Sequence, residues 1–116
     1  MADVFYLPRA AEAVIPTHKL VEYALNPEHP RGQHNARVFQ SALGIARSDW
    51  RYLHDQLLAG VVGVPVRGTR MTPFGVVYDI VLSVDGLNGA TRPVMTIWMV
   101  EAGSSPRLVS TWVDIP

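Results

Sequence analysis

The spacing of the apolar residues changes near residue 60, and this change constrains the fold more than any other feature. Before it, apolar residues recur every three or four positions, which is the spacing of an amphipathic helix. After it, apolar residues alternate with their neighbours, which is the period of a strand with one buried face. Helices followed by consecutive strands predict an α+β fold with an antiparallel meander, not the βαβ order of a parallel sheet.

About three helices are predicted in the first half, because proline, glycine and capping residues mark their ends. The first starts at Pro16-Thr17, with Thr17 as its N-cap, and ends at Asn26-Pro27. The predicted second helix runs from His34 to Leu43 and stops at Gly44. The third opens at Ser48-Asp49 and closes at Gly60.

The second half predicts three or four antiparallel strands that pack against these helices. The clear strands are Val76–Val84, Val94–Glu101 and Leu108–Ile115, with a hairpin loop at Asp85–Gly89. The stretch Val61–Met71 is read as an edge strand or a loop, because glycine and proline interrupt it. The expected core comprises Trp50, Leu53, Leu57, Val38, Phe39, Tyr78, Ile80, Leu82, Ile97 and Val109.

Length and composition exclude several classes of protein. A chain of 116 residues predicts a single domain covering residues 1–116. Ten basic residues balance ten acidic ones, so no global field attracts a polyanion, although a local basic patch is still possible. The lack of cysteine excludes a disulfide scaffold and a thiol nucleophile. No signal peptide or membrane-spanning segment is recognised, so we expect a cytoplasmic protein that does not contact membranes.

The four histidines are the first candidates for acid–base chemistry, because only histidine has an ordinary pKa near neutral pH. They are His18, His29, His34 and His54. Their spacing does not match a metal-binding motif, and the carboxylates are scattered, so no metal is expected. Neither a nucleophile elbow nor a phosphate-binding glycine loop occurs, so no cofactor is expected either.

A basic pair stands at the start of the predicted second helix. His34 and Arg37 lie three residues apart, hence on one helix face, where free amides and the helix dipole favour a phosphate. Alternatively, Arg37 pairs with a surface carboxylate. On the last strand, Ser110 is expected to share a face with Leu108 and Trp112, and Thr111 to point the other way. A hydroxyl there either contacts a phosphate oxygen or satisfies a neighbouring backbone group.

Residues 7–44 resemble the N-terminal signature of a small bacterial family of unknown function. That pattern runs K-L-x-x-Y-x-L-N-x-x-H-P-x-G-x-x-K-A-x-x-F and then Leu-Gly. The matching residues are Lys19, Leu20, Tyr23, Leu25, Asn26, His29, Pro30, Gly32, Ala36, Phe39, Leu43 and Gly44. A looser second half matches at Phe74-Gly75, Tyr78, Asn88-Gly89, Ile97-Trp98 and Pro106-Arg107-Leu108-Val109 before Ser110.

Members of that family occur in toxin–antitoxin-like gene pairs and at the C-termini of polymorphic toxins. Their order of elements is similar to that of the barnase/EndoU/colicin/RelE-like ribonuclease toxins. The resemblance therefore implies an RNA-cleaving domain that needs no metal, in which the ribose 2′-OH attacks the adjacent phosphate. The implied acid–base pair is His29 and His34. The implied phosphate contacts are Arg37 and Arg107, with Ser110 or Thr111 as a supporting donor.

Three alternatives stand beside this interpretation. Asn35 occupies the position of the family's lysine, so a lysine-dependent step would be weakened in this chain. His29 could instead hold the loop that contains Pro30 and Gly32. The rival function is a non-catalytic module that binds a cognate antitoxin or immunity protein, or forms a homodimer, through a sheet edge. The enzyme hypothesis requires His29, His34 and Arg37 to converge with the last strand.

Overall fold

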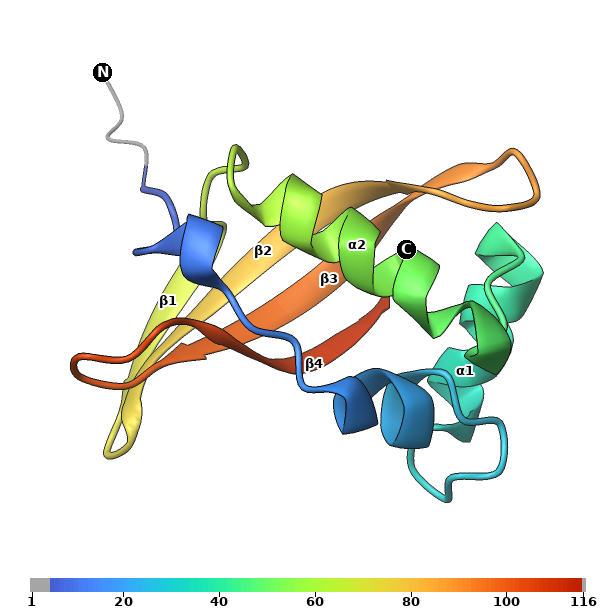
Figure 1. Ribbon diagram of the computed structural model, residues 1–116, viewed down its shortest axis with the longest axis horizontal. Helices are drawn as coiled ribbons and strands as arrows, with labels where there is room; N and C mark the ends of the chain where they lie inside the picture. Colours follow the sequence, from blue (N-terminus) through green and yellow to red (C-terminus); the bar gives the residue numbers. More distant parts are fainter. Residues whose placement is uncertain (1–4, 116) are drawn as a thin grey trace.

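The computed structural model describes residues 5–115, and in these residues every helical segment precedes a four-stranded antiparallel sheet (Figure 1). This is the order that the sequence predicts. The helical segments are η1 (Ala10–Glu12), η2 (Lys19–Ala24), α1 (Gln33–Leu43), η3 (Arg47–Asp49) and α2 (Trp50–Val61). The strands are β1 (Gly68–Thr72), β2 (Gly75–Asp85), β3 (Thr91–Val100) and β4 (Arg107–Val113). None of these helices is long and apolar enough to cross a bilayer.

The sheet is a meander in the order β1-β2-β3-β4, and each strand pairs antiparallel with the next. Gly75, which opens β2, has φ of 150°, and a Cβ there would collide with the carbonyl of Val100. At the opposite edge, the N-terminal segment makes a parallel bridge between Val14 and Arg107. The N–H of Leu108 donates to the carbonyl of Val14 over 2.9 Å. The segment before η2 therefore lies beside β4.

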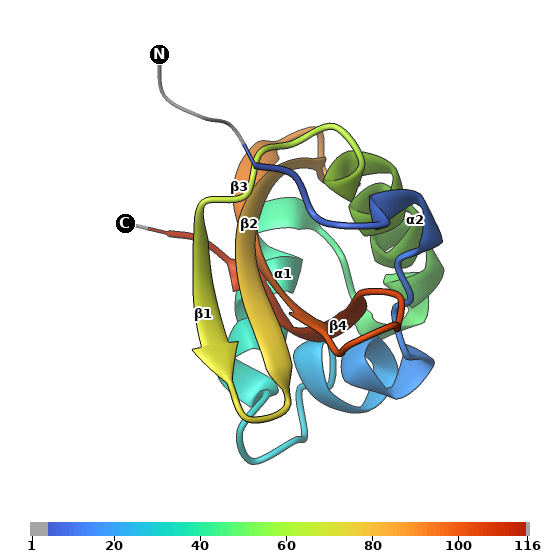
Figure 2. The ribbon, with the colours of Figure 1, turned by 90° about the vertical axis from the view of Figure 1, so that its left-hand side faces the viewer.

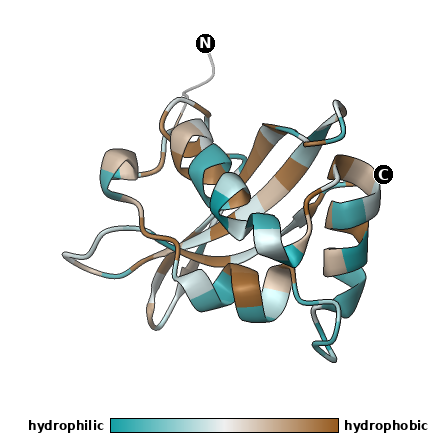
Figure 3. Cartoon of the chain, turned by 45° about the vertical axis from the view of Figure 1, so that its right-hand side comes forward, coloured by the Kyte–Doolittle hydropathy of each residue, from teal (hydrophilic) through white to brown (hydrophobic). Residues whose placement is uncertain are grey.

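The core lies between the helices and one face of the sheet, as the end-on view shows (Figure 2). Alternate residues of β2, such as Ile80 and Leu82, point into it. The helices are banded with hydrophobic and hydrophilic residues (Figure 3), as expected for amphipathic helices. The indole N–H of Trp98 donates to the hydroxyl of Thr96 over 2.7 Å, and that hydroxyl donates to the carbonyl of Ile80 over 2.7 Å. Both polar side chains are fully buried, so this chain of hydrogen bonds removes the cost of burying them unpaired.

The two long helices end close to where the sequence predicts. Gly44 adopts the left-handed conformation, with φ of 67°, and closes α1. The carboxylate of Asp49 accepts the N–H of Ala46 over 2.9 Å at the entry to α2. Helix α2 continues past Gly60 to Val61, and the lack of a side chain at Gly60 lets the helix pass close to Leu82 of the sheet.

The first predicted helix takes a different form. Residues Lys19–Ala24 wind as a π-helix, in which the N–H of Leu25 bonds to the carbonyl of Leu20 over 2.8 Å. Thr17 does not cap this segment: His18 occupies the position before it, without a side-chain cap. The wider turn still buries Leu20 and Ala24, so the apolar spacing predicted the packing but not the winding.

Two residues of the expected core lie outside it. Ile97 and Val109 are half-buried and do not belong to the central cluster. Ile97 stands between the buried Thr96 and Trp98, so alternation points it to the opposite face of the sheet. Val109 lies where the pairing of β3 with β4 shifts register. This irregularity turns Leu108 into the core, with Trp98 as its partner. Ser110 therefore does not share a face with Leu108, contrary to the strict alternation that the sequence predicted.

This difference between the two faces predicts two different mutational losses. Ile80→Ala removes a side chain with no exposed surface and should lower the free energy of unfolding by about 2–5 kcal/mol. Ile97→Ala, on the other face, should cost less than about 2 kcal/mol. Urea denaturation of both variants measures the difference. Equal losses would mean that the second face of the sheet is as tightly covered as the first.

Candidate functional site

The loop that leads into α1 is organised around His29. Its Nδ1 accepts the backbone N–H groups of Arg31 and Gly32, each over 3.0 Å. Its ring lies against Tyr23, with a centroid separation of 4.6 Å. A Cβ at Gly32 would collide with the carbonyl of Tyr23, so only glycine lets the loop pass this close to η2. The shared His-Pro-x-Gly pattern therefore has a structural explanation.

These hydrogen bonds also limit what the His29 ring can do. Because Nδ1 accepts twice, the ring proton is assigned to Nε2. In this form His29 can donate a hydrogen bond through Nε2, but it has no free lone pair with which to act as a base. Its position supports the structural role that the sequence left open.

The first turn of α1 presents hydrogen-bond donors, is followed at once by Arg37, and contains no acidic residue. No side chain caps the helix, and among residues 5–115 the N–H groups of His34 and Asn35 find no acceptor. The His34 side chain is exposed and Asn35 is half-buried. Arg37 is exposed and donates to the Gln33 amide oxygen over 3.3 Å, so its partner is a neutral amide and not a carboxylate. This turn keeps a net attraction for an anion.

The three predicted site residues on β4 have different surroundings. Thr111 is buried and its hydroxyl donates to the carbonyl of Met95 over 2.8 Å, which is the structural alternative considered for it. Ser110 is half-buried and points to the face of the sheet away from Thr111. Arg107 is exposed and pairs with the carboxylate of Glu101 over 2.8 Å.

The structure thus gathers part of the predicted set. His34, Asn35 and Arg37 share the first turn of α1, and His29 stands in the loop before it. Ser110 and Thr111 point to opposite sides of the sheet. Within residues 5–115, no hydrogen bond or ion pair joins the first turn of α1 to β4, although the two elements pack together.

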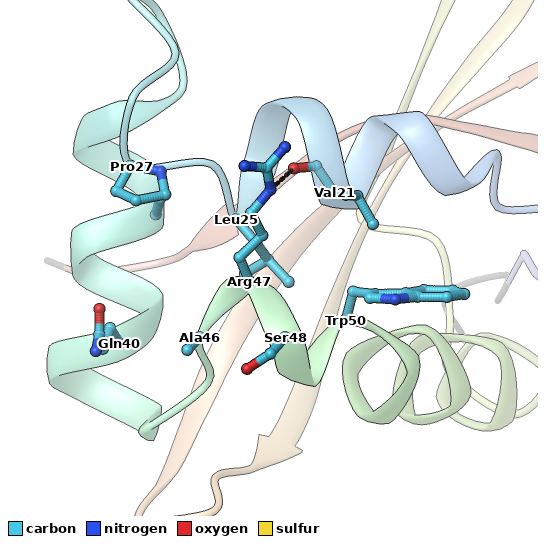
Figure 4. A pocket seen from close by; sticks show the side chains of 9 residues that line it. Val21, Leu25, Pro27, Gln40, Ala46, Arg47, Ser48 and Trp50 are labelled. Carbon is cyan, nitrogen blue, oxygen red and sulfur yellow. Dashed lines mark hydrogen bonds between the residues drawn. The ribbon is translucent and has the colours of Figure 1, made fainter.

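A pocket of about 550 Å³ opens beside the same helix (Figure 4). It lies between η2, α1 and the connection that begins α2. Its apolar walls come from Val21, Leu25, Pro27, Ala36 and Ala46; its polar and aromatic groups are Gln40, Arg47, Ser48 and Trp50. None of the seven predicted site residues lines it.

Sequence reasoning missed this pocket because it assigned Trp50 to the core on spacing alone. The residue is half-buried, packing against the core on one side and lining the pocket on the other. The only local signal in the sequence was the placement of Arg47 and Trp50 on either side of the helix start predicted at Ser48-Asp49. The described residues also contain no group of three or more histidine, aspartate or glutamate side chains arranged to hold a metal ion.

The His29 loop predicts a graded response to substitution. His29→Ala leaves the N–H groups of Arg31 and Gly32 without their acceptor and should destabilise the protein by about 1–3 kcal/mol. His29→Asn keeps a short acceptor that can bond two or three residues ahead, so it should restore part of the loss. Thermal unfolding of both variants compares them. Equal stability of wild type and His29→Ala would remove the loop-holding role.

Comparison with known proteins supports the fold. A chain in a solved structure, described as a contact-dependent growth inhibition toxin–immunity protein complex from Klebsiella pneumoniae 342, superposes with a TM-score of 0.71. The two chains share 13% identity, over 87% of this chain and 99% of that one, so the likeness concerns the fold. No curated protein matches the chain. The model of a family described as a domain of unknown function, DUF6883, matches residues 6–114, and the chain belongs to that family.

Proposed function

We propose that this chain is a toxin-like domain that binds RNA at the first turn of α1 and cleaves it without a metal ion. The observation that carries the proposal is the chemistry of that turn. Counting partners among residues 5–115, it combines an exposed imidazole, an arginine without a carboxylate partner and two backbone N–H groups without acceptors, and it contains no acidic residue. A phosphodiester is the anion that would use both the charges and the amides.

The fold comparison agrees with this proposal at a coarser level. The similar chain belongs to a complex of a growth-inhibition toxin with its immunity protein, so a toxin and a toxin's partner are both compatible with the fold. The anion-attracting turn favours the toxin side of such a pair. A cognate antitoxin or immunity protein is then the expected partner, and it would act by covering α1.

The proposed reaction assigns one proton transfer to His34. Its imidazole takes the proton of a ribose 2′-OH, whose oxygen forms a bond to the adjacent phosphorus as the bond to the 5′-oxygen breaks. The leaving oxygen takes a proton from solvent, and a 2′,3′-cyclic phosphate remains. Arg37 and the free amides of the first turn stabilise the charge on the phosphorane oxygens. The proton on Nε2 of His29 is available as one more donor.

This assignment predicts that His34→Ala abolishes most of the activity. RNA cleavage by the purified chain in excess EDTA should fall by roughly 10²–10⁴-fold, because that is the usual contribution of a general base. Electrophoresis of a labelled RNA and detection of the cyclic phosphate end measure the effect.

The matched control is His18→Ala, which removes an exposed histidine before a different helical segment. This control should cleave like wild type. Equal cleavage by wild type and His34→Ala would show that the nuclease activity, if any, resides elsewhere.

Position 35 provides a separate prediction about affinity. Asn35→Lys places a cation where the family's pattern has lysine, and a charge-assisted contact to phosphate is roughly twice as strong as a neutral one. The variant should therefore bind a short RNA more tightly than wild type, and Arg37→Ala should bind it more weakly. Titrations at two salt concentrations should show that binding by all three weakens with salt. Equal, salt-insensitive binding would remove the phosphate site.

A specific observation also supports the rival function, an interaction module. Among residues 5–115, β1 pairs with only one other strand, β2, and four large apolar side chains around it are more than half exposed: Phe5, Tyr6, Met71 and Phe74. Three of them line a single shallow pocket there. An edge strand beside such a patch is suited to pairing with a strand of another chain. Tight binding of a partner protein together with no RNA cleavage would favour this function.

A further inference from the structure

We infer that the pocket between η2, α1 and η3 is a nucleobase-binding site that holds a base of the RNA while its phosphate lies at the first turn of α1. The inference rests on the proposed function for its substrate, but it concerns different residues and a different chemical group. No residue of the pocket is among those assigned to the cleavage step.

The size and lining of the pocket suit a flat, largely apolar ring. Its volume of about 550 Å³ lies inside the range of roughly 300–1,000 Å³ that is usual for small-molecule sites. Aliphatic side chains from three elements, among them Val21, Leu25 and Ala36, line it. The Trp50 indole, seen edge-on in Figure 4, forms one end of the pocket.

The polar groups of the pocket match the edge of a base. The side chains of Gln40 and Ser48 form no hydrogen bond with any residue from 5 to 115. An amide offers a donor and an acceptor at once, as the hydrogen-bonding edges of nucleobases do, and a hydroxyl can serve either way. A ligand that only needed burial would not require these two groups.

The pocket carries one positive charge and no negative one, which suits a nucleotide within a polyanion such as RNA. Arg47 donates through Nε to the carbonyl of Val21 over 2.7 Å (Figure 4). This bond holds the guanidinium at the mouth of the pocket, where its two terminal nitrogens can donate to a ligand. Among the described residues Arg47 has no carboxylate partner, and no acidic side chain lines the pocket. A ligand without a ring would leave the Trp50 wall unused. A purely apolar ligand would leave the Gln40 amide unused.

Trp50 is held in place, as a stacking platform requires. The guanidinium of Arg51 lies 5.1 Å from the ring centroid. His54 meets the ring edge-on, with centroids 6.1 Å apart. Aromatic side chains of this kind accept any base, because every base has a π-face.

The pocket and the first turn of α1 are neighbours on one helix. Gln40 lines the pocket and comes three residues after Arg37, so these two side chains lie on the same side of the helix. A base in the pocket and its own phosphate beside Arg37 are therefore compatible with the length of one nucleotide. The base would position the scissile phosphate beside Arg37, whose neighbour one turn earlier on the helix is His34.

Mononucleotides test the pocket without requiring RNA cleavage. The purified chain is titrated with the 3′-monophosphates of adenosine, guanosine, cytidine and uridine, and with ribose phosphate and inorganic phosphate as probes without a base. Indole fluorescence and the NMR signal of the Trp50 indole N–H report binding. We expect at least one nucleotide to bind tenfold or more tightly than ribose phosphate and to shift that signal.

Ala46→Leu fills the pocket and should weaken nucleotide binding at least tenfold, whereas Ala59→Leu, the same change at an exposed position of α2, should not. Gln40→Leu is a second variant at an exposed position, where folding is not at risk, and it should change the order of preference among the four bases. His18→Ala changes an exposed histidine outside both the pocket and the first turn of α1, and it should leave nucleotide binding within about threefold of wild type.

Nucleotide binding that is no tighter than that of ribose phosphate would overturn the inference, as would binding unaffected by both Ala46→Leu and Gln40→Leu. The inference and the proposed function fail separately. Pocket-dependent nucleotide binding without RNA cleavage would reject the nuclease and keep the base site. Cleavage that depends on His34 and ignores the pocket variants would do the reverse.

Discussion

The burial of Phe39 and Leu43 anchors α1, and every feature of the candidate site depends on where that helix lies. Both side chains have no exposed surface, so each contributes on the order of 1.5–3 kcal/mol of burial. The hairpin between β2 and β3 also holds the C-terminal end of the helix in place, because the N–H of Leu87 donates to the carbonyl of Leu43 over 2.8 Å. With one face and the C-terminal end fixed, the opposite face and the first turn must point outward.

The same helix therefore presents two surfaces with different chemistry. Its first turn is entered from the His29 loop and exposes His34 and Arg37. On another side of the helix, Ala36 and Gln40 face η2 and the start of α2, and these elements enclose the pocket. Anion attraction and apolar enclosure are thus adjacent but separate. This is why charge variants and pocket-filling variants are expected to affect different properties.

The ion pairs of the protein contribute little to this arrangement. The Arg9–Glu12 and Arg107–Glu101 pairs are exposed to solvent. Exposed pairs of this kind typically contribute only about 0–1 kcal/mol to stability. The buried polar groups contribute more to the specificity of the fold. Thr96 and Thr111 each satisfy a carbonyl of a neighbouring strand, which helps to set the pairing of β2 with β3 and of β3 with β4.

Local patterns in the sequence determined the class of fold, the spans of α1 and α2, and the strands of the meander. The signals that set them act over a few residues: the spacing of apolar side chains, the stop at Gly44 and the helix start at Asp49. They also placed His34 and Arg37 together near the start of α1. Only the tertiary structure decided the π-helical winding of η2, the register shift after Ile97 and the pocket beside Trp50. Each of these depends on contacts between segments that are distant in the chain. The spacing of apolar residues within one segment cannot show which side of a half-buried residue meets the core.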